Sequence, residues 1–281
     1  METSEIIKKF GIRPARRLGQ HFLTDEAPVL AMIEAAGISK TDGVLEIGPG
    51  LGILTVKLCE RAGKVVAVEK DRELVPVLDK VTSDFKNICI IEDDVLKLDL
   101  SDIRKSYFAS DFKVVANLPY YITSPIIMKI IDNRHMIPVA VVMVQKEVAE
   151  RLVAPPGKKD YGILSIAVQL YADVDIICPV KRDAFIPPPR VDSAVVRLSL
   201  RQSTRVPVEN EPLFFKVVEA AFGERRKTVK NSLKRRLGIP GAGDAVDRAL
   251  KEARIDPDRR GETLSLEEFA ALTRAIERYM G

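Results

Sequence analysis

The sequence predicts an α/β fold, with an open sheet flanked by helices and followed by a small all-helical domain. Three observations lead to this prediction. Residues 44–56 combine a short apolar run, a turn with alternate glycines and the start of a helical pattern. After about residue 200, apolar residues recur at helical spacing instead. Further short apolar runs, typical of buried strands, stand at 65–68, 88–91, 114–116, 139–144, 174–178 and 194–198.

The length and composition are those of a globular protein with two domains. A chain of 281 residues can form one large domain and one small one, and we expect these to span residues 1–200 and 201–281. Hydrophobic residues make up 46% and charged residues 30%, which does not indicate disorder. No apolar run approaches the ~20 residues of a membrane span, and the amino end lacks a signal-peptide pattern. We therefore expect a cytoplasmic protein that does not enter a membrane.

Cysteine and histidine usage argues against disulfides and metal ions. The three cysteines, Cys59, Cys89 and Cys178, are far apart in the chain. An odd, scattered set of this kind is typical of free thiols in a reducing compartment. There are only two histidines and no paired cysteines, so the sequence offers no metal-ligand cluster.

The first elements have clear local signals. A helix is expected to begin after Thr24 or Asp25, either of which can cap it, and to end at Gly37. The strand at 44–47 then runs into Gly48, Gly50 and Gly52, and a helix follows. A strand, a glycine turn and a helix in this order present backbone N–H groups to a ligand. Gly48 and Gly50 are therefore candidate cofactor-binding residues.

The glycine spacing does not match a nicotinamide fingerprint, because Ile53 stands where the third glycine would be. The next strand, however, ends in Glu69, about twenty residues past the first glycine, where a carboxylate can bind both hydroxyls of a ribose. A solvated carboxylate at a strand end is the alternative. The upstream glycines favour the ribose.

A third strand at 88–91 ends in three acidic residues, of which we select Asp94. Its carboxylate could accept a hydrogen bond from an adenine amino group, since this strand lies on the ligand side of such a sheet. On spacing alone, a simple loop carboxylate is nearly as good an interpretation.

The fourth strand, at 114–116, runs into Asn117, Leu118, Pro119 and Tyr120. Pro119 keeps Leu118 extended, so the chain leaves the strand without curling into a helix. The Asn117 side-chain oxygen and a main-chain carbonyl can then accept the hydrogens of an exocyclic aromatic amine, while the Tyr120 ring stacks on the base. A polar turn stopped by proline is the alternative, but the position at the carboxyl end of a strand favours a ligand site.

The segment 185–193, which contains three consecutive prolines, is stiff and could hold Phe185 as a second stacking face. A core phenylalanine is the ordinary alternative. The strand at 194–198 follows without a crossover helix, which implies an antiparallel neighbour. In the helical tail, Ser265 and Glu268 form a capping box for a final helix.

Basic residues are concentrated in two runs, although the net charge is only +4. One run lies near the amino end and comprises Lys8, Lys9, Arg13, Arg16 and Arg17. The other lies in the helical tail, where Arg226, Lys230 and Lys234 are spaced i, i+4, i+8 and would form a basic ridge. Such runs are usually solvated faces, but two of them on a near-neutral chain favour a polyanionic partner. The candidate RNA-binding residues are Arg225, Arg226, Lys227, Lys230 and Lys234.

Taken together, these motifs resemble the KsgA family of S-adenosylmethionine-dependent ribosomal RNA adenine dimethyltransferases. The resemblance covers nearly the whole chain, in order. The matching pieces are LGQHFL (18–23), LEIGPGLGILT (45–55), VEKD (68–71), EDDV (92–95), NLPYYITSPI (117–126), FIPPPRVDS (185–193) and AFGERRKTVKNSL (221–233). The last piece looks bacterial and is the most specific of them.

The resemblance implies a class I methyltransferase with a Rossmann-like sheet of seven strands, the last one antiparallel, and S-adenosylmethionine as the cofactor. It makes His21 and Leu23 cofactor contacts, although many relatives carry asparagine at the histidine. It also assigns Gly48 to the methionine end of the cofactor, Glu69 to the ribose and Asp94 to the adenine amino group. Asn117 lies on the boundary between the cofactor and the target base.

The implied reaction places two methyl groups on N6 of each of two adjacent adenosines, in a hairpin near the 3′ end of small-subunit (16S) rRNA. The target base would be extruded and stacked, and positioning would supply much of the rate. Such an enzyme would act on the immature 30S subunit during ribosome assembly, and we expect a monomer. Three alternatives are a methylase of large-subunit rRNA or DNA, a non-catalytic assembly factor, and a nicotinamide dehydrogenase, which Ile53 disfavours.

Overall fold

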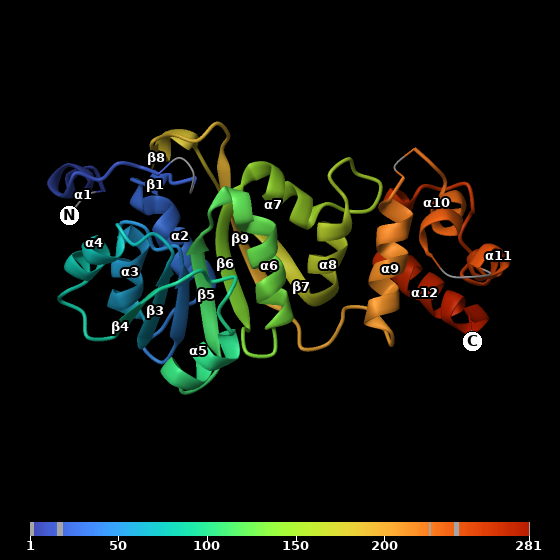
Figure 1. Cartoon of the computed structure of the whole chain (residues 1–281), viewed down its shortest axis with the longest axis horizontal. Helices are drawn as coiled ribbons and strands as arrows, with labels where there is room; N and C mark the ends of the chain where they lie inside the picture. The colour runs from blue at the N-terminus through green and yellow to red at the C-terminus, as the bar shows by residue number, and fades with distance from the viewer. Residues whose placement is uncertain (1–2, 16–18, 225, 239–241, 281) are drawn as a thin grey trace. The chain divides into compact units, whose positions relative to one another are not determined.

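The computed structural model describes residues 3–15, 19–224, 226–238 and 242–280. The chain forms two compact units (Figure 1). The first comprises Met1–Ala149 with Ala172–Gln202, and the second Glu150–Tyr171 with Ser203–Gly281. The first domain predicted from the sequence, residues 1–200, includes Glu150–Tyr171. In the structure this segment belongs with the helical unit, because its helix packs against a helix of the carboxyl-terminal part.

The first unit is built around a seven-stranded sheet, whose strands lie side by side in Figure 1. Their order across the sheet is β4-β3-β2-β5-β6-β9-β7. The strands are β2 (Gly43–Ile47), β3 (Lys64–Glu69), β4 (Ile88–Glu92), β5 (Phe112–Asn117), β6 (Val139–Gln145), β7 (Ala172–Val180) and β9 (Ser193–Leu200).

The direction of the strands creates a ligand-binding edge. β2 pairs in parallel with both β3 and β5, so the chain builds outward from β2 first on one side and then on the other. At such a switch point the loops beyond the strand ends diverge and leave a crevice. β9 lies between β6 and β7 and is antiparallel to both, which confirms the antiparallel last strand.

Helices pack around this sheet, and α2 shows how local sequence sets their limits. The Asp25 side chain accepts a hydrogen bond from the N–H of Ala27, and Gly37 ends α2 with a φ of 57°. Both ends of this helix were therefore predicted correctly, and Met32 of α2 is fully buried in the core. The helices that begin in this unit are α1 (Thr3–Phe10), α2 (Glu26–Ala36), α3 (Ile53–Arg61), α4 (Val75–Val81), α5 (Leu100–Tyr107), α6 (Thr123–Asp132) and α7 (Lys146–Val153).

A separate two-stranded sheet joins two distant segments of the first unit. β1 (Phe22–Leu23) pairs with β8 (Phe185–Ile186) in antiparallel register. Thr24 extends this pairing, because its backbone N–H and its hydroxyl both donate to the carbonyl of Ala184. The LGQHFL and FIPPPRVDS motifs therefore lie next to each other.

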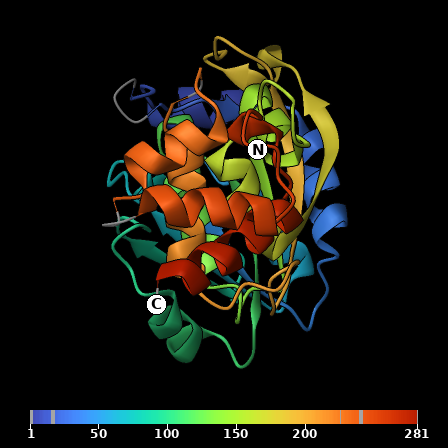
Figure 2. The same cartoon turned by 90° about the vertical axis from the view of Figure 1, so that its right-hand side faces the viewer.

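The second unit is helical. α9, α10 and α12, in orange and red in Figure 2, pack as a group with α11. Its helices are α8 (Ile163–Tyr171), α9 (Glu211–Phe222), α10 (Val229–Arg236), α11 (Ala242–Glu252) and α12 (Leu266–Met280). Within the described ranges of the two units, no helix is long and apolar enough to cross a lipid bilayer.

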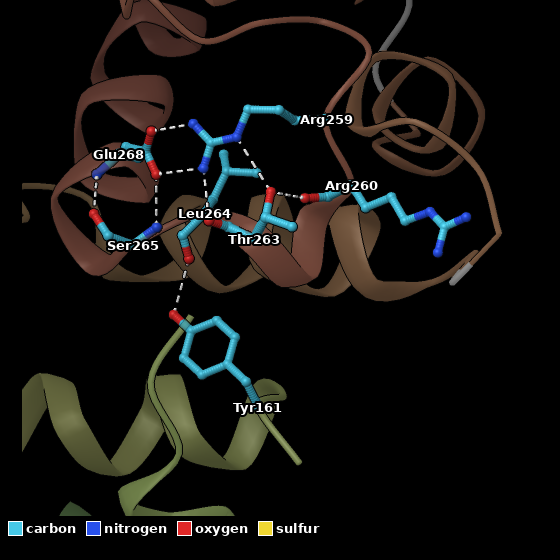
Figure 3. Close-up of polar contacts among 7 residues, drawn as sticks. All are labelled: Tyr161, Arg259, Arg260, Thr263, Leu264, Ser265 and Glu268. Carbon is cyan, nitrogen blue, oxygen red and sulfur yellow. Dashed lines mark hydrogen bonds and ion pairs between the residues drawn. The ribbon is translucent and has the colours of Figure 1, made fainter. Parts of the chain in front are cut away.

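The start of α12 is the predicted capping box. Ser265 N–H donates to the Glu268 carboxylate at 2.8 Å, and Glu268 N–H donates to the Ser265 hydroxyl at 3.3 Å. Figure 3 shows that Glu268 also binds the Arg259 guanidinium, and that the Tyr161 hydroxyl points at the Leu264 carbonyl. Burial alone would raise the pKa of Glu268, but the hydrogen bonds from Arg259 and Ser265 outweigh it and lower that pKa. These contacts hold the start of α12 against the segment before α8.

Candidate active site

The glycine turn after β2 needs its glycines. Gly48, Gly50 and Gly52 have φ values of 67°, 58° and 87°, in the left-handed region that favours glycine. Gly52 also packs tightly, because a Cβ there would lie 2.9 Å from Leu78 of α4. At Gly48 the neighbour is different: a Cβ would lie 3.7 Å from the Pro119 ring and 3.9 Å from the Asn117 carbonyl oxygen. The turn therefore faces the corner that follows β5.

That corner is rigid. Asn117 is the last residue of β5 and pairs with Met143 of β6, and the N–H of Leu118 donates to the Met143 carbonyl at 3.1 Å. Pro119 has a φ of −59° and a ψ of 129°, so the chain leaves the strand in an extended form. None of the hydrogen bonds of the described chain uses the Asn117 side-chain amide. The amide is therefore available to a ligand.

Glu69, at the end of β3, is tied to the glycine turn. Its carboxylate accepts hydrogen bonds from the N–H groups of Gly50 at 3.1 Å and Asp71 at 2.8 Å. The residue is buried, so it is not the solvated strand-end carboxylate that was considered as an alternative. Burial raises its pKa, although the two N–H donors act in the opposite direction.

Asp94 lies just beyond β4 and is paired with a lysine. Its carboxylate accepts a hydrogen bond from Lys70 Nζ at 2.8 Å and another from the N–H of Leu96 at 3.0 Å. The hydrogen bond from Lys70 is the main reason why the pKa of Asp94 is lowered. The lowered pKa keeps the Asp94 carboxylate charged at the carboxyl end of β4.

These elements surround one cavity with about 1110 Å³ of empty space, open solvent included. The amino-terminal segment at Gly19–Leu23 covers part of it. The candidate residues that line the cavity are His21, Leu23, Gly48, Gly50, Glu69, Asp94, Asn117, Leu118, Pro119 and Tyr120. Residues from four strand ends and from the amino-terminal segment therefore converge on one ligand site.

Phe185 is the exception among the predicted site residues. It is only 2% exposed, belongs to the hydrophobic core and is not among the residues that line the cavity. Its pairing in β8 with Leu23 of β1 turns the ring into the core instead. The prediction of a second stacking face at Phe185 is corrected: the residue is the core phenylalanine of the alternative interpretation.

Among the cavity residues that the sequence did not predict, Glu46 has the most unusual environment. Glu46 of β2 lines the cavity, is 1% exposed, and its Oε2 atom has no hydrogen-bond partner among the described residues. Burial raises the pKa of its carboxyl to about 8, and the negative charge of Glu69 adds to the rise. The signal was present in the sequence, since a lone carboxylate interrupts the apolar run at 44–47.

The predicted basic ridge is shorter than expected. The Thr228 hydroxyl caps α10, so the helix begins at Val229 and Arg226 precedes it. Lys230 and Lys234 do share a face of α10, but both form ion pairs with Asp247 of α11, at 3.1 Å and 2.8 Å. Lys227 lies in the turn before the helix. Arg225, and Arg16 and Arg17 of the amino-terminal basic run, lie outside the described residues, as does Leu18 of the LGQHFL motif.

The cavity fits S-adenosylmethionine in its chemistry. The unpartnered oxygen of Glu46 suits a cationic group, because a positive charge nearby would lower the raised pKa of this carboxyl and stabilise its ionised form. Glu69 and Asp94 can accept hydrogen bonds from hydroxyl and amino groups, and the glycine turn lets a ligand approach the backbone closely. A sulfonium nucleoside carries all of these groups.

Fold and site together define a class I methyltransferase, with the cofactor cavity at the switch point of the sheet and a polar corner beside it. The model of the family described as "Ribosomal RNA adenine dimethylase" matches residues 13–274. The chain belongs to this family. It is an adenine dimethyltransferase that uses S-adenosylmethionine.

Individual relatives agree with this assignment. The chain is 49% identical over 278 residues to a ribosomal RNA small subunit methyltransferase A of Geobacillus sp. (strain WCH70), covering 98% of this chain and 96% of the relative. It is 46% identical over 277 residues to the protein of the same name in Bacillus mycoides (strain KBAB4), covering 98% and 95%.

Two solved structures are similar in fold as well. A dimethyladenosine transferase from Plasmodium falciparum matches with a TM-score of 0.77 and 30% identity, covering 90% of this chain and 96% of that one. The 23S rRNA methyltransferase ErmE matches with a TM-score of 0.69 and 27% identity, covering 91% and 99%.

Proposed function

We propose that this chain transfers two methyl groups to N6 of each of two adjacent adenosines in the 3′-terminal hairpin of small-subunit (16S) rRNA. The observation that carries the proposal is the approach of the Gly48 turn to the Asn117 corner. The names of the relatives at 46% and 49% identity support the small subunit as the source of the RNA. We further propose that the protein works as a monomer in the cytoplasm, on the immature 30S subunit.

The cofactor would be held by residues that line the cavity. S-adenosylmethionine supplies an electrophilic methyl group on a positively charged sulfur. Glu69 would accept hydrogen bonds from the ribose hydroxyls, and Asp94 from the adenine amino group. His21 and Leu23 would close the cavity from the amino-terminal side, and Gly48 would allow close approach at the methionine end.

The chain's contribution to the reaction is to hold the target amine. An adenine N6 is a weak nucleophile, because its lone pair is delocalised into the ring. The Asn117 oxygen and a backbone carbonyl of the corner would each accept an N6 hydrogen, which favours a pyramidal nitrogen with its lone pair directed outward. Tyr120 would stack on the extruded base. No strong base is needed, since the proton can leave after the transfer.

The proposed RNA target can be tested by mass mapping of methylated adenosines in rRNA, from cells with and without this protein. We expect dimethyladenosine to disappear from two adjacent sites in small-subunit rRNA when the protein is absent. Purified protein should restore both sites on separated small subunits and leave large subunits and duplex DNA unmodified. Methyl transfer to large-subunit rRNA alone would refute the proposed target while leaving the enzyme class intact.

We propose that Lys230, Lys234 and the preceding Arg226 and Lys227 bind RNA phosphates. Changing Lys230 and Lys234 to glutamate should weaken RNA binding and reduce the slope of log affinity against log salt by up to about 2, because each lost phosphate contact removes about 0.9. Asp247→Asn should act in the opposite direction, since Asp247 now neutralises both lysines. Fluorescence anisotropy across a salt series measures both effects.

A matched control is available on α5. Arg104 and Lys105 are also paired with acidic residues, Asp111 and Asp102. Their reversal to glutamate changes the net charge by the same amount and should leave the salt slope close to that of the wild type. If reversal at Lys230 and Lys234 has no larger effect than reversal at this control pair, α10 is not part of the RNA-binding surface.

A further inference from the structure

The segment 185–193 contacts the two aromatic rings at the cavity, although Phe185 itself does not reach it. The imidazole Nδ1 of His21 lies 2.7 Å from the Pro187 carbonyl oxygen. The hydroxyls of Tyr120 and Ser193 share a hydrogen bond of 2.7 Å. Both rings line the cavity, whereas no residue of the FIPPPRVDS motif that holds them is among the lining residues. The motif therefore contacts the site through the Pro187 carbonyl and the Ser193 hydroxyl, and not through the Phe185 ring.

Ser193 is a rigid anchor. It is the first residue of β9 and pairs with Gln145 of β6 on one side and with Val180 of β7 on the other. Its exposed fraction is 0%, so its hydroxyl has no access to solvent. A short hydrogen bond between two hydroxyls, with one of them fixed in the middle of a sheet, restricts the other strongly. The tip of the Tyr120 side chain is therefore held by the sheet.

The backbone of Tyr120 is held independently. It follows Pro119 in a short 3₁₀ turn, and the Thr123 hydroxyl donates to the carbonyls of Pro119 at 3.1 Å and Tyr120 at 3.3 Å. With the backbone fixed at one end and the phenol oxygen at the other, the long axis of the ring is fixed, and stacking on His21 opposes rotation of the ring about that axis. Loss of either constraint would leave the ring free to tilt.

His21 determines which face of Tyr120 is open. The two rings are stacked, with centroids 5.7 Å apart and planes 25° apart. A carbonyl oxygen can only accept, so Nδ1 of His21 carries the hydrogen and donates it to Pro187, which fixes the imidazole. The pairing of β1 with β8 keeps His21 in this position. A base can stack only on the face of Tyr120 opposite His21.

We propose that Ser193 is a positioning residue for methyl transfer: its hydroxyl fixes the Tyr120 ring, and the ring in turn fixes the amine of a stacked base at Asn117. This inference rests on the proposed function of Tyr120. Misplacement of a reacting group by about 1 Å can cost 10²-fold in rate, so a freed ring should lower turnover and leave binding nearly unchanged.

The test is a double-substitution cycle with Ser193→Ala and Tyr120→Phe, which remove the same hydrogen bond from its two ends. Each variant should lower kcat by about tenfold or more, with the KM for RNA and the cofactor affinity within about twofold of the wild type. The double variant should be no slower than the slower single variant, because the second change removes nothing further. Ser193→Thr keeps a hydroxyl and should recover most of kcat.

Ser165→Ala is the matched control. Ser165 is also fully buried, and its hydroxyl donates to the Arg151 carbonyl at 2.6 Å in the second unit. If this variant loses stability like Ser193→Ala but keeps kcat, general loss of a buried serine hydrogen bond does not explain the effect. If Ser193→Ala does not fold, Tyr120→Phe still measures the effect on kcat of losing this hydrogen bond.

Two results would overturn the inference: a kcat within twofold of the wild type in the folded variants, or single effects that multiply in the double variant. All rates are measured on whichever RNA the wild-type protein methylates. Failure of the proposed rRNA target would show in the wild type, and failure of the positioning role only in the variants. The two are therefore distinguishable.

Discussion

Asn117→Ala is expected to lower turnover by roughly 10²- to 10³-fold and to leave the fold and RNA binding intact. The side-chain amide takes part in no hydrogen bond of the described chain, so its loss leaves no buried partner unsatisfied. The strand itself is held by backbone pairing with Met143, which alanine preserves. What is lost is an acceptor for the target amine, at a position where no solvent group can replace it with the same geometry.

Single-turnover methyl transfer, measured with saturating RNA and cofactor, reports this loss directly, and anisotropy reports RNA binding. Asn133→Ala is a suitable control, since Asn133 ends α6 and its amide donates to the Lys129 carbonyl. That variant should lose some stability and keep its rate per folded molecule. Wild-type turnover in Asn117→Ala would exclude the role proposed for the corner.

Glu46→Gln is expected to remove most of a pH dependence that the wild-type protein shows in its stability. The pKa of Glu46 is about 8 in the folded protein against an ordinary value of 4.5. Below pH 4.5 the carboxyl is protonated in both the folded and the unfolded chain. Between these values only the unfolded chain releases its proton, so the free energy of unfolding falls as pH rises, and the fall ends at about pH 8.

The size of the effect follows from the same shift. The free energy of unfolding should fall by at most about 1.4 kcal/mol per pH unit, and by about 5 kcal/mol in total as an upper bound. Glutamine mimics the protonated carboxyl at all pH values, so the variant should be the more stable protein at pH 8. Urea unfolding curves between pH 5 and pH 9, without cofactor, measure the difference.

Glu60→Gln is the control for this experiment, because the side chain of Glu60 on α3 is partly exposed and forms an ion pair with Lys57. This substitution should leave the slope of the free energy of unfolding against pH unchanged. A wild-type slope that Glu46→Gln does not alter would mean that the Glu46 carboxyl is ionised in the folded protein, and the orphaned oxygen would then need another explanation.

Several parts of the fold were predictable because their signals are local. Asp25 and Gly37 bound α2 through contacts within one turn of the helix, and Ser265 with Glu268 does the same for α12. The antiparallel orientation of β9 followed from the length of one connection, since a short link has no room for a crossover helix. The strand ends that carry Glu69 and Asn117 were also predictable, because parallel strands present their carboxyl ends at one edge.

Other features depended on the packing of distant segments. Phe185 enters the core because β8 pairs with β1, some 160 residues earlier in the chain. The segment Glu150–Tyr171 joins the helical unit through contacts such as that of Tyr161 with Leu264. The predicted ridge does not include Arg226, because the Thr228 cap starts the helix after it. The charges of Lys230 and Lys234 are paired with Asp247, which lies on another helix.

The sequence by itself determined which chemical groups stand at the strand ends. These are a glycine turn, two carboxylates and an asparagine-proline corner, each specified by neighbours a few residues away. Only the tertiary structure decided how these parts are supported. The Tyr120–Ser193 hydrogen bond and the His21–Pro187 contact arise between segments far apart in the chain. Local spacing carries no information about such contacts, because they exist only after the sheet has brought those segments together.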